Sequence, residues 1–567
     1  TGWNSVINGN RLEMYPSTDL RNSLTGLATG VEVREFSGQP GISAQEYLGS
    51  FGATEKISIL SRGQRMQFII DNVPIDITEM PLDPNEIESV SIVKDIAAKA
   101  MFGPAAADGI VYIRTKRGAK NEHSTNINIE HGVNIIDRMP GWVNGAEYAT
   151  LNNQARVNDG LTPNYTQADI DAYALNNPWD KYHPNVNFKD MMLKNTMSLT
   201  RANISSSGGN DAVQYFSYLG YDGEGDIYKI GAKADYNKIT TRSNIDIKVN
   251  DFLKVQFDFY GNLTYRRSSN YGFASNFTDE GNSFLSLVEM PKLLNDITSI
   301  PPVAFPVYAS YDSISKVPWY GVSQAYGSNP IGNLERNGYY TETGRTGAAN
   351  ITLNYDMGQF IPGLKSKTYL GINVYNLTRI GKPEDYIAYV ATPSLSPATG
   401  NDTILLAKKH LGYDAADMAK LMDFYFQRFA IYENISYDRT FGKSNVKSSL
   451  TYYLSKVSRN GIEEPERQQN AILTGTYTYD DKYSILGVLN YAGTYSFAKD
   501  KRYGLFPSIG ASWVISEENF MKNSKFINFL KLRDQGGVLG VENFLSPFYY
   551  IDRWSVNTSG GAFGPNS

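Results

Sequence analysis

The chain contains no cysteine among its 567 residues, and this absence removes several kinds of chemistry at once. Disulfide bonds, thiolate zinc sites and cysteine nucleophiles are excluded, while the cellular compartment stays open. Histidine is also scarce, and none of the four residues stands at a metal-binding spacing: His123, His131, His183 and His410. The sequence therefore predicts no metal site and no cofactor.

An excess of charge of one sign is missing as well. The 53 basic and 58 acidic residues leave a formal net charge of −5, so we expect no nucleic-acid partner. No stretch approaches the roughly 20 apolar residues of a membrane-spanning helix, and no signal-peptide pattern marks the N-terminus. A membrane is still compatible with the chain, because barrel strands show an apolar residue only at every second position.

Aromatic residues and glycine, by contrast, are abundant. The chain has 40 Tyr, 26 Phe and 50 Gly, while only 41% of its residues are apolar. β-Strands favour aromatic residues, and tight turns favour glycine. The composition therefore indicates a mainly β protein, far longer than one ordinary domain.

The hydrophobic pattern changes near "TKRGAKNEHS", residues 115–124. Before this point short strands mix with short helices, and after it long alternating runs are broken by turns. The clearest run is residues 254–266, "KVQFDFYGNLTYR", in which Val255, Phe257 and Phe259 alternate with polar residues. Strands of soluble sandwiches have about 5 to 6 residues, whereas a tilted membrane strand needs about 9 to 11. This run is of membrane length.

The alternation recurs in pairs of segments, which are 350–357 with 367–376, 428–438 with 445–457, and 471–479 with 483–497. The last two pairs are joined by short turns, whereas residues 268–346 and 378–424 read as very long loops. Short turns at one end and long loops at the other are typical of a transmembrane β-barrel. Aromatic residues end many strands, as in interfacial girdles, although strand preference alone also favours them: Tyr265, Tyr355, Tyr437, Tyr479, Tyr483 and Trp513.

The long segments carry signals of their own. Residues 145–157 and 166–177 read as short helices, and residues 301–330 form a loop rich in proline and aromatic residues. Trp319 and Tyr320 of that loop could stack on sugar rings or peptide side chains, or could pack the loop on itself. We favour packing, because loops of this length must bury their own apolar side chains.

Residues 83–118 read as a strand, helix and strand unit. Asp83 is a helix N-cap with Pro84 at the first position and Glu86 at the third, and Gly103 ends the helix of residues 95–102. No glycine-rich loop precedes a helix, so the unit has no phosphate site. Its acidic residues read as caps and solvated faces, and residues 114–120 as a solvated basic exit. Without a catalytic constellation, we predict that the chain is not an enzyme.

The sequence closely resembles the SusC-like TonB-dependent outer-membrane transporters of the Bacteroidetes (the SusC/RagA family). The matching segments occur in the family's order across nearly the whole chain: "SRG" (61–63), "FIIDNVPI" (68–75), "DPNEIESVSIVKDIAAKAMFG" (83–103), "AAADGIVYIRTKRG" (105–118), "YFSYLGYDGEGDIYK" (215–229), "YGLFPSIGASWVISEENF" (503–520) and "LKLRDQGG" (530–537). The chain departs from the family at Asn72, where glycine is usual, and at Asp108, where asparagine is usual.

The resemblance implies a mainly β fold, a transmembrane antiparallel β-barrel of about 22 strands with an N-terminal mixed α/β plug domain in its lumen. We expect residues 1–120 to form the plug and residues 121–567 the N-terminal portion of the barrel, with extracellular loops at about 268–346 and 378–424. The residues after the plug suffice for about a dozen strands at roughly ten residues each plus loops. The chain is therefore expected to be part of a longer protein.

The resemblance also implies TonB-dependent import of an oligosaccharide or peptide across the outer membrane. Its expected partners are a SusD-like surface lipoprotein that captures substrate, the TonB complex on the periplasmic side, and outer-membrane lipid. The alternative is a SusC-like barrel that has lost transport and serves as a docking subunit of a larger assembly. The predicted plug framework is Arg62, Gly63, Asp71, Gly103 and Gly109, and the candidate substrate contacts are Gln64, Arg65, Met66, Asp76, Trp319 and Tyr320.

Overall fold

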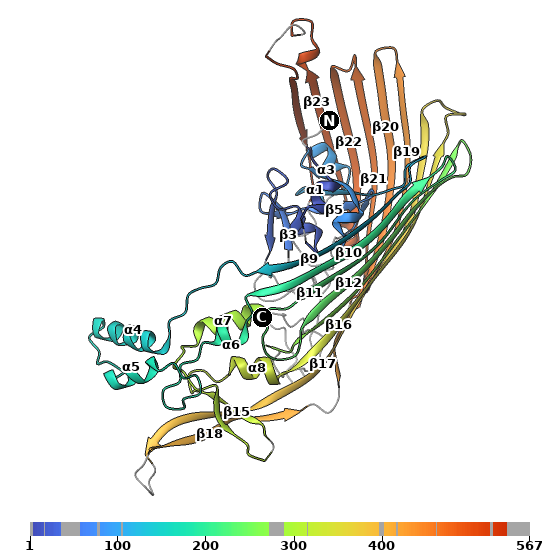
Figure 1. Cartoon of the computed structure of the whole chain (residues 1–567). Helices are drawn as coiled ribbons and strands as arrows, with labels where there is room; N and C mark the ends of the chain where they lie inside the picture. The colour runs from blue at the N-terminus through green and yellow to red at the C-terminus, as the bar shows by residue number, and fades with distance from the viewer. Residues whose placement is uncertain are drawn as a thin grey trace.

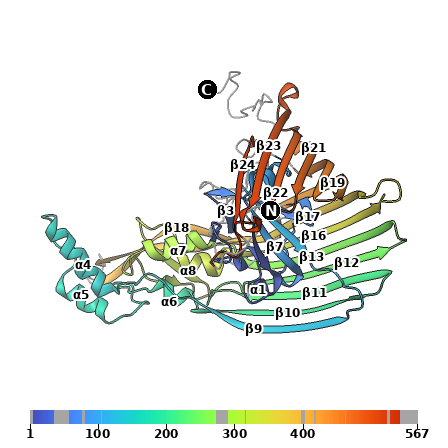
Figure 2. The same ribbon diagram turned by 90° about the horizontal axis from the view of Figure 1, so that it is seen from above.

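The computed structural model describes most of the chain. The described residues are 4–15, 17–35, 57–75, 80–103, 106–271, 289–314, 316–395, 402–414, 418–460, 462–521 and 526–540. Two bodies of strand dominate them, a small mixed sheet near the N-terminus and a very large sheet that curves around it (Figure 1). Seen from above in Figure 2, the small sheet lies on the concave side of the large one. No helix among the described residues is long and apolar enough to cross a membrane.

The small sheet has the strand order β1-β7-β8-β5-β6. Only β5 and β8 pair in parallel, and the other neighbours are antiparallel. Its strands are β1 (Asn4–Asn8), β5 (Gln67–Ile70), β6 (Val73–Pro74), β7 (Ile87–Val93) and β8 (Ile110–Thr115). A three-stranded sheet accompanies it, with β2 (Glu32–Glu35), β3 (Ile57–Ser61) and β4 (Gln64–Arg65). The helices are α1 (Gly9–Glu13), α2 (Leu20–Ser23), the 3-10 helix η2 (Pro84–Glu86) and α3 (Ile96–Ala100). We call the described residues up to 118 the N-terminal unit.

Local sequence rules account for much of this unit. Asp83 caps η2 in a reciprocal capping box with Glu86, as predicted. Between β5 and β6 the backbone turns at Asp71 and Asn72, both with positive φ (48° and 76°), which a tight two-residue hairpin turn requires. Asn72 therefore occupies a left-handed position that glycine usually takes. The predicted two-turn helix of residues 95–102 is shorter, because α3 ends at Ala100 and Gly103 turns away with φ 82°.

The large sheet, called the wall below, is antiparallel along the order β9-β10-β11-β12-β13-β16-β17-β19-β20-β21-β22-β23-β24. Its strands are β9 (Ser124–Ile135), β10 (Thr196–Gly209), β11 (Val213–Gly225), β12 (Asp235–Lys248), β13 (Leu253–Ser269), β16 (Gly338–Asp356), β17 (Leu364–Leu395), β19 (Ala419–Phe441), β20 (Ser444–Arg459), β21 (Ile462–Tyr479), β22 (Tyr483–Thr494), β23 (Tyr503–Val514) and β24 (Lys531–Gly537). Short 3-10 helices, Lys499–Lys501 and Ile515–Glu517, flank β23. Among the described residues the wall stays open, since β9 and β24 each have one neighbour.

Burial on the two faces of the wall is the reverse of that in a soluble sheet, since apolar side chains are exposed and polar side chains are buried. On β13 the apolar side chains Phe259 and Leu263 are 49% and 44% exposed, while their polar neighbours Asp258 and Arg266 are 6% and 3% exposed. The polar positions point toward the N-terminal unit, and we call this side the inner face. An apolar outer face on strands of 12 or more residues is what a lipid bilayer requires. The predicted transmembrane β-barrel architecture is therefore confirmed.

Aromatic residues line both ends of the outer face. At the end with short turns, Tyr483 and Trp513 stack with ring centroids 6.3 Å apart. Near the opposite end of the same hairpin, Tyr491 and Tyr503 stack at 5.3 Å. Side chains of this kind prefer the interface between lipid and water, so the two levels bracket the apolar band.

The connections at the other end fold into a body of their own, which we call the loop body. Its elements are α4 (Gly145–Asn158), α5 (Gln167–Ala174), α6 (Phe188–Met192), α7 (Glu289–Ser299), α8 (Pro330–Arg336), β14 (Tyr308–Tyr311), β15 (Pro318–Val322) and β18 (Asp402–Asp414). A buried apolar core unites α6, α7, α8, β14 and β15 with the extension of β17. Asn329 sits inside it: the side-chain amide donates to the carbonyls of Val307 and Gly321, and its oxygen accepts from the amides of Ile331 and Gly332. The long connections are therefore packed rather than extended into solvent.

One predicted loop has a different structure. Residues 378–424 were expected to be a long loop, but β17 continues to Leu395 and pairs with β18, and β19 begins at Ala419. The physical reason is burial: Tyr386, Ala388 and Val390 alternate along β17 and enter the core of the loop body. The other predicted loop lies between β13 and β16. The division of the chain at residue 120 stays a prediction.

Candidate functional site

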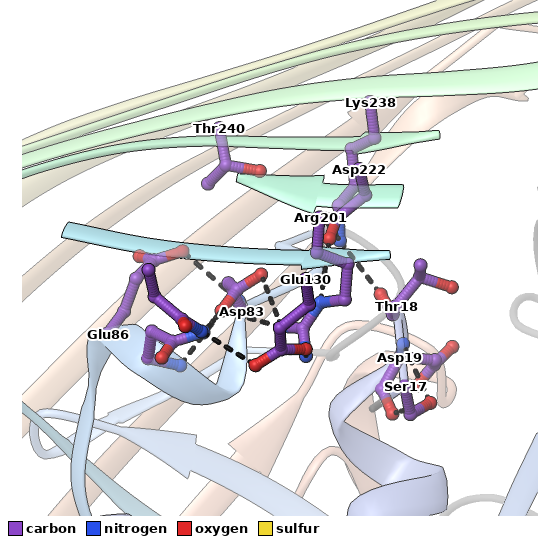
Figure 3. A network of polar contacts seen from close by, with 12 residues as sticks. Ser17, Thr18, Asp19, Asp83, Glu86, Glu130, Arg201, Asp222, Lys238 and Thr240 are labelled. Atoms are coloured by element: carbon purple, nitrogen blue, oxygen red, sulfur yellow. Dashed lines mark hydrogen bonds and ion pairs between the residues drawn. The ribbon is translucent and has the colours of Figure 1, made fainter. Parts of the chain in front are cut away.

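Asp83 of the N-terminal unit is buried against the inner face of β10, β11 and β12 (Figure 3). Arg201 of β10 reaches it at 3.4 Å and reaches Asp222 of β11 at 3.0 Å. Lys238 of β12 lies 2.9 Å from Asp222 and donates to the carbonyl of Thr18 at 2.8 Å. Each of the four charged side chains is almost entirely buried. Because an unpaired charge costs several kcal/mol in such surroundings, these groups depend on one another.

Glu86, one helical turn further along, makes the second half of the arrangement. One carboxylate oxygen lies 2.5 Å from the Arg242 guanidinium of β12, and both residues are buried. Arg242 also lies over the ring of Tyr260, 5.0 Å from its centroid. Three acids and three bases thus meet between the N-terminal unit and the wall. We call them the charge cluster, which comprises Asp83, Glu86, Arg201, Asp222, Lys238 and Arg242.

The same short motif that starts η2 also presents the acids to the wall. Asp83 accepts hydrogen bonds from the backbone and side chain of Asn85, both at 2.8 Å. Glu86 accepts from the Asp83 amide at 3.1 Å through the oxygen that does not contact Arg242. The capping box holds both carboxylates in one geometry before they meet their partners. The sequence predicted Asp83 and Glu86 as helix caps with solvated side chains. They are helix caps, but their side chains are buried.

The pKa values of the two acids are shifted in opposite directions. Burial alone would raise the pKa of Asp83, but the charges of Lys238 and Arg201 together hold that pKa below its ordinary value. Burial raises the pKa of Glu86 above its ordinary value, more than Arg242 lowers it, and the charge of Asp83 adds to the rise. Glu86 is therefore the member of the pair that is easier to protonate.

Arg117 fastens the exit from β8 to the wall. Its two terminal nitrogens lie 2.7 Å from Asp246 of β12 and 2.7 Å from Asp258 of β13, both of which are buried. Asn244 of β12 donates to the carbonyl of Lys116 at 2.7 Å. Residues 114–120 were predicted as a solvated exit, and this does not hold for Arg117, because the register of β12 and β13 brings two carboxylates to it.

The opposite side of the N-terminal unit meets the wall through amides. Asn490 of β22 donates to the carbonyl of Ala100 in α3 at 2.8 Å. Gln535 of β24 donates to Asp95 at 2.8 Å, which joins two segments that carry the family resemblance. A side chain at Gly103 would approach the amide of Asn470 at 3.0 Å. This seam is tightly packed and carries fewer charges than the cluster on β10 to β12.

The predicted framework residues occupy turns of the N-terminal unit. Asp71 accepts from the Thr115 amide at 3.0 Å and from its hydroxyl at 2.7 Å, so the hairpin turn is tied to β8. Gly109 has φ 131°, and a side chain there would approach Met66 at 2.9 Å. Arg62 and Gly63 form the exposed turn between β3 and β4 with φ 54° and 80°. These residues and Gly103 lie where the backbone changes direction. Their role in the plug framework stays a prediction.

The candidate substrate contacts do not share one environment. Gln64 and Arg65 are exposed on β4, whereas Met66 is buried in the core of the N-terminal unit. Trp319 is partly buried and stacks on Tyr389 at 4.8 Å. Tyr320 is fully buried in the loop body and donates to Glu335 at 2.6 Å. Asp76 lies outside the described residues. Contact with substrate stays a prediction for these positions.

The charge cluster was missed in the sequence, although a signal for it was present. On β12 the inner positions Lys238, Arg242 and Asp246 are charged at even spacing between apolar or small outer residues. A row of charges on one face of a long strand indicates charged partners inside the barrel rather than solvent. No sequence rule, however, pairs Lys238 or Arg242 with a motif some 150 residues away.

Comparison with known proteins gives a consistent result. Residues 1–110 match the family model described as the TonB-dependent Receptor Plug Domain. The chain is 25% identical over 560 residues to TonB-dependent receptor P26 of Formosa agariphila, covering 95% of this chain and 51% of that protein. It is 23% identical over 610 residues to TonB-dependent receptor SusC of Bacteroides thetaiotaomicron, covering 98% and 53%. The solved structure of the RagAB peptide importer in its open-open state is similar with a TM-score of 0.69 at 17% identity, covering 95% of this chain and 60% of that one.

The chain is similar to the TonB-dependent receptors and contains a match to their plug domain. Its resemblance to the SusC-like members of the family, predicted from the motifs, is confirmed by these relatives. The likeness to the RagAB importer shows the fold alone. The chain spans about half the length of the curated relatives it matches.

This similarity and the apolar outer face of the wall are those of an outer-membrane β-barrel. Residues 1–110 are the plug, and the N-terminal unit is called the plug from here on. From the usual arrangement of outer-membrane barrels, we expect the end of the wall with short turns to be periplasmic and the loop body to be extracellular. The charge cluster is then a buried connection between plug and barrel inside the lumen.

Proposed function

We propose that the receptor imports an oligosaccharide or a peptide across the outer membrane, driven from the periplasm by TonB. The observation that carries this proposal is the charge cluster, in which the plug is held to the barrel by paired charges that exclude water. Losing one partner of such a contact is costly, but both partners regain hydration when force separates them together. A plug retained in this way suits a gate that must open and close repeatedly.

The proposal assigns a SusD-like surface lipoprotein to the capture of substrate and the TonB complex to the opening of the plug. Support for both comes from the family and from the fold neighbour, which is described as a peptide importer. The loop body offers the lipoprotein a packed surface, because α6, α7, α8, β14 and β15 share one buried core with β17. The alternative of a docking subunit without transport predicts the same fold but no uptake.

Uptake of labelled oligosaccharides and labelled peptides should be measured in cells that carry or lack the complete gene. We expect the gene to raise uptake of one substrate class, and the rise to vanish when TonB is removed. Uptake that is independent of both the gene and TonB would overturn the importer and leave the docking subunit. Copurification separates the two further, since a lone lipoprotein favours import and a large stoichiometric complex favours docking.

A further inference from the structure

Two cavities lie on one side of the plug. The first, of about 350 Å³, is bounded by the Asp71–Asn72 turn of the plug and by inner residues of β12, β13, β16 and β17. The second, of about 490 Å³, opens at the periplasmic end among the turns that follow β10, β12 and β16. We call them the inner cavity and the vestibule.

The two cavities follow the same strands at consecutive inner positions. On β13 Lys254 lines the vestibule and Gln256 the inner cavity, and on β16 Asn354 lines the vestibule and Thr352 the inner cavity. Lys367 of β17 lines both. Residues two apart on a strand are separated by about 6.6 Å, so no further row of side chains lies between the two spaces. The two cavities are adjacent, divided by side chains that hydrogen-bond to one another, Gln256 to Asp246 at 2.8 Å and Asn354 to Gln256 at 3.0 Å, and we call the two together the groove.

On its other sides the plug meets the barrel more closely, with a smaller cavity of about 130 Å³ beside Phe102 at β21 to β23. On β10 to β12 the charge cluster is buried, and on β22 to β24 helix α3 packs against Asn490 and Gln535. The two larger cavities therefore lie along β12 to β17, where Arg117 of the plug also pairs with Asp246 and Asp258.

Apolar side chains close the groove at its extracellular end. Val73 and Ile75 of the plug and Tyr260 and Tyr369 of the barrel line the inner cavity and belong to one buried cluster. Tyr260 also donates to the carbonyl of Pro81 at 2.8 Å. This contact is mainly apolar, and Arg242 of the charge cluster lies over the ring of Tyr260 at its edge.

We propose that substrate passes the plug along the inner face of β13, β16 and β17, and that the contact of Val73 and Ile75 with Tyr260 and Tyr369 closes this path. The inference rests on the proposed import function. The groove carries charges of both signs, among them Asp71, Asp258, Arg114, Arg117 and Lys367. Such a lining suits a polar molecule of low net charge and would hold a polyanion or polycation too tightly for release.

These 567 residues contain no cysteine, so crosslinking within them can be tested in the full-length protein once any cysteine elsewhere in it is replaced by serine. Pro81→Cys with Tyr260→Cys places two thiols across the proposed path, and Ala100→Cys with Asn490→Cys places them across the opposite seam. The pairs are matched, since in each a barrel side chain donates to a plug carbonyl at 2.8 Å. With a bifunctional maleimide, we expect the first crosslink to lower uptake about tenfold or more and the second to lower it less than about twofold.

The outcomes separate the path from the import function. Equal loss of uptake in both crosslinked pairs would mean that the plug leaves as one body, and it would overturn the path. Loss of uptake in the second pair alone, or in neither pair, would overturn the path as well. Absence of uptake before crosslinking overturns import itself and the path with it.

A measurement independent of transport is the labelling of single cysteines by a membrane-impermeant maleimide from the periplasmic side. Gln256→Cys should react at least about tenfold faster than the buried Asn490→Cys, and equal rates would contradict an open groove.

Discussion

Glu86 of the plug and Arg242 of the barrel lie 2.5 Å apart, and neither side chain is reached by solvent to more than a few per cent. The two residues are 156 positions apart in the chain. Their contact, with the neighbouring pair of Asp83 and Arg201, ties the plug to the barrel wall by opposite charges rather than by apolar packing. Four predictions follow from this arrangement and from the faces of the wall.

Loss of one partner of the buried pair should weaken the plug strongly. Arg242→Ala leaves Glu86 without its guanidinium, and we expect about 3 to 5 kcal/mol of lost stability. Thermal unfolding in detergent and protease cleavage of the plug would measure it. Arg114→Ala is the control, because Arg114 and Glu88 form an exposed pair at 3.7 Å worth about 0 to 1 kcal/mol. Equal effects of the two variants would contradict a special role for the cluster.

Stability of the plug should depend on pH through Glu86. Because its pKa in the folded protein lies above the unfolded value of about 4.5, the folded state binds a proton more readily. Its contribution is fully present below pH 4.5 and is lost as pH rises through the raised pKa. Asp83, with a lowered pKa, acts oppositely: its contribution is present above about pH 3.8 and is lost as pH falls further. Melting temperatures of the wild type and of Glu86→Gln, compared from pH 4 to 8, should therefore diverge as pH rises, with the wild type losing more. Parallel curves would refute this assignment.

Gly338 should not tolerate a side chain. It begins β16 with φ 79°, and a Cβ there would lie 1.8 Å from the carbonyl oxygen of Lys382 in β17. Gly338→Ala must pay about 1 to 2 kcal/mol for the left-handed backbone and must also displace β17. Gly347→Ala in the same strand meets only a methyl of Val374 at 3.5 Å. We expect poor assembly into the outer membrane for the first variant and wild-type levels for the second, scored by the heat-dependent shift of the barrel on gels.

The outer face of β13 should reject charge. Phe259 lies near the middle of the strand and is 49% exposed toward lipid, so Phe259→Lys should cost about 2 to 4 kcal/mol. Gln256→Lys on the inner face adds the same charge beside Asp246, to which Gln256 already donates at 2.8 Å. Recovery of each variant from outer membranes is the measurement. If Gln256→Lys were lost and Phe259→Lys retained, the assignment of the two faces would be wrong.

Much of the fold was predictable because its signals are local. The capping box of Asp83 and Glu86, the left-handed turn at Asp71 and Asn72, and the period of two along β13 depend on neighbours within a few positions. The β17 and β18 hairpin was missed for a related reason. Its alternation at Tyr386, Ala388 and Val390 was present, but it lay beyond the length expected for a membrane strand.

By itself, then, the sequence determined most strands, the turns, the caps and the resemblance to the family, since each depends on short motifs and periods. Tertiary structure alone decided that Asp83 meets Arg201 and that Glu86 meets Arg242. Those pairs depend on the register of each wall strand with the next, summed from β9 to β12, and on where the plug lies inside. A local pattern shows that a charged side chain faces inward, but only the assembled wall and plug show which opposite charge it pairs with.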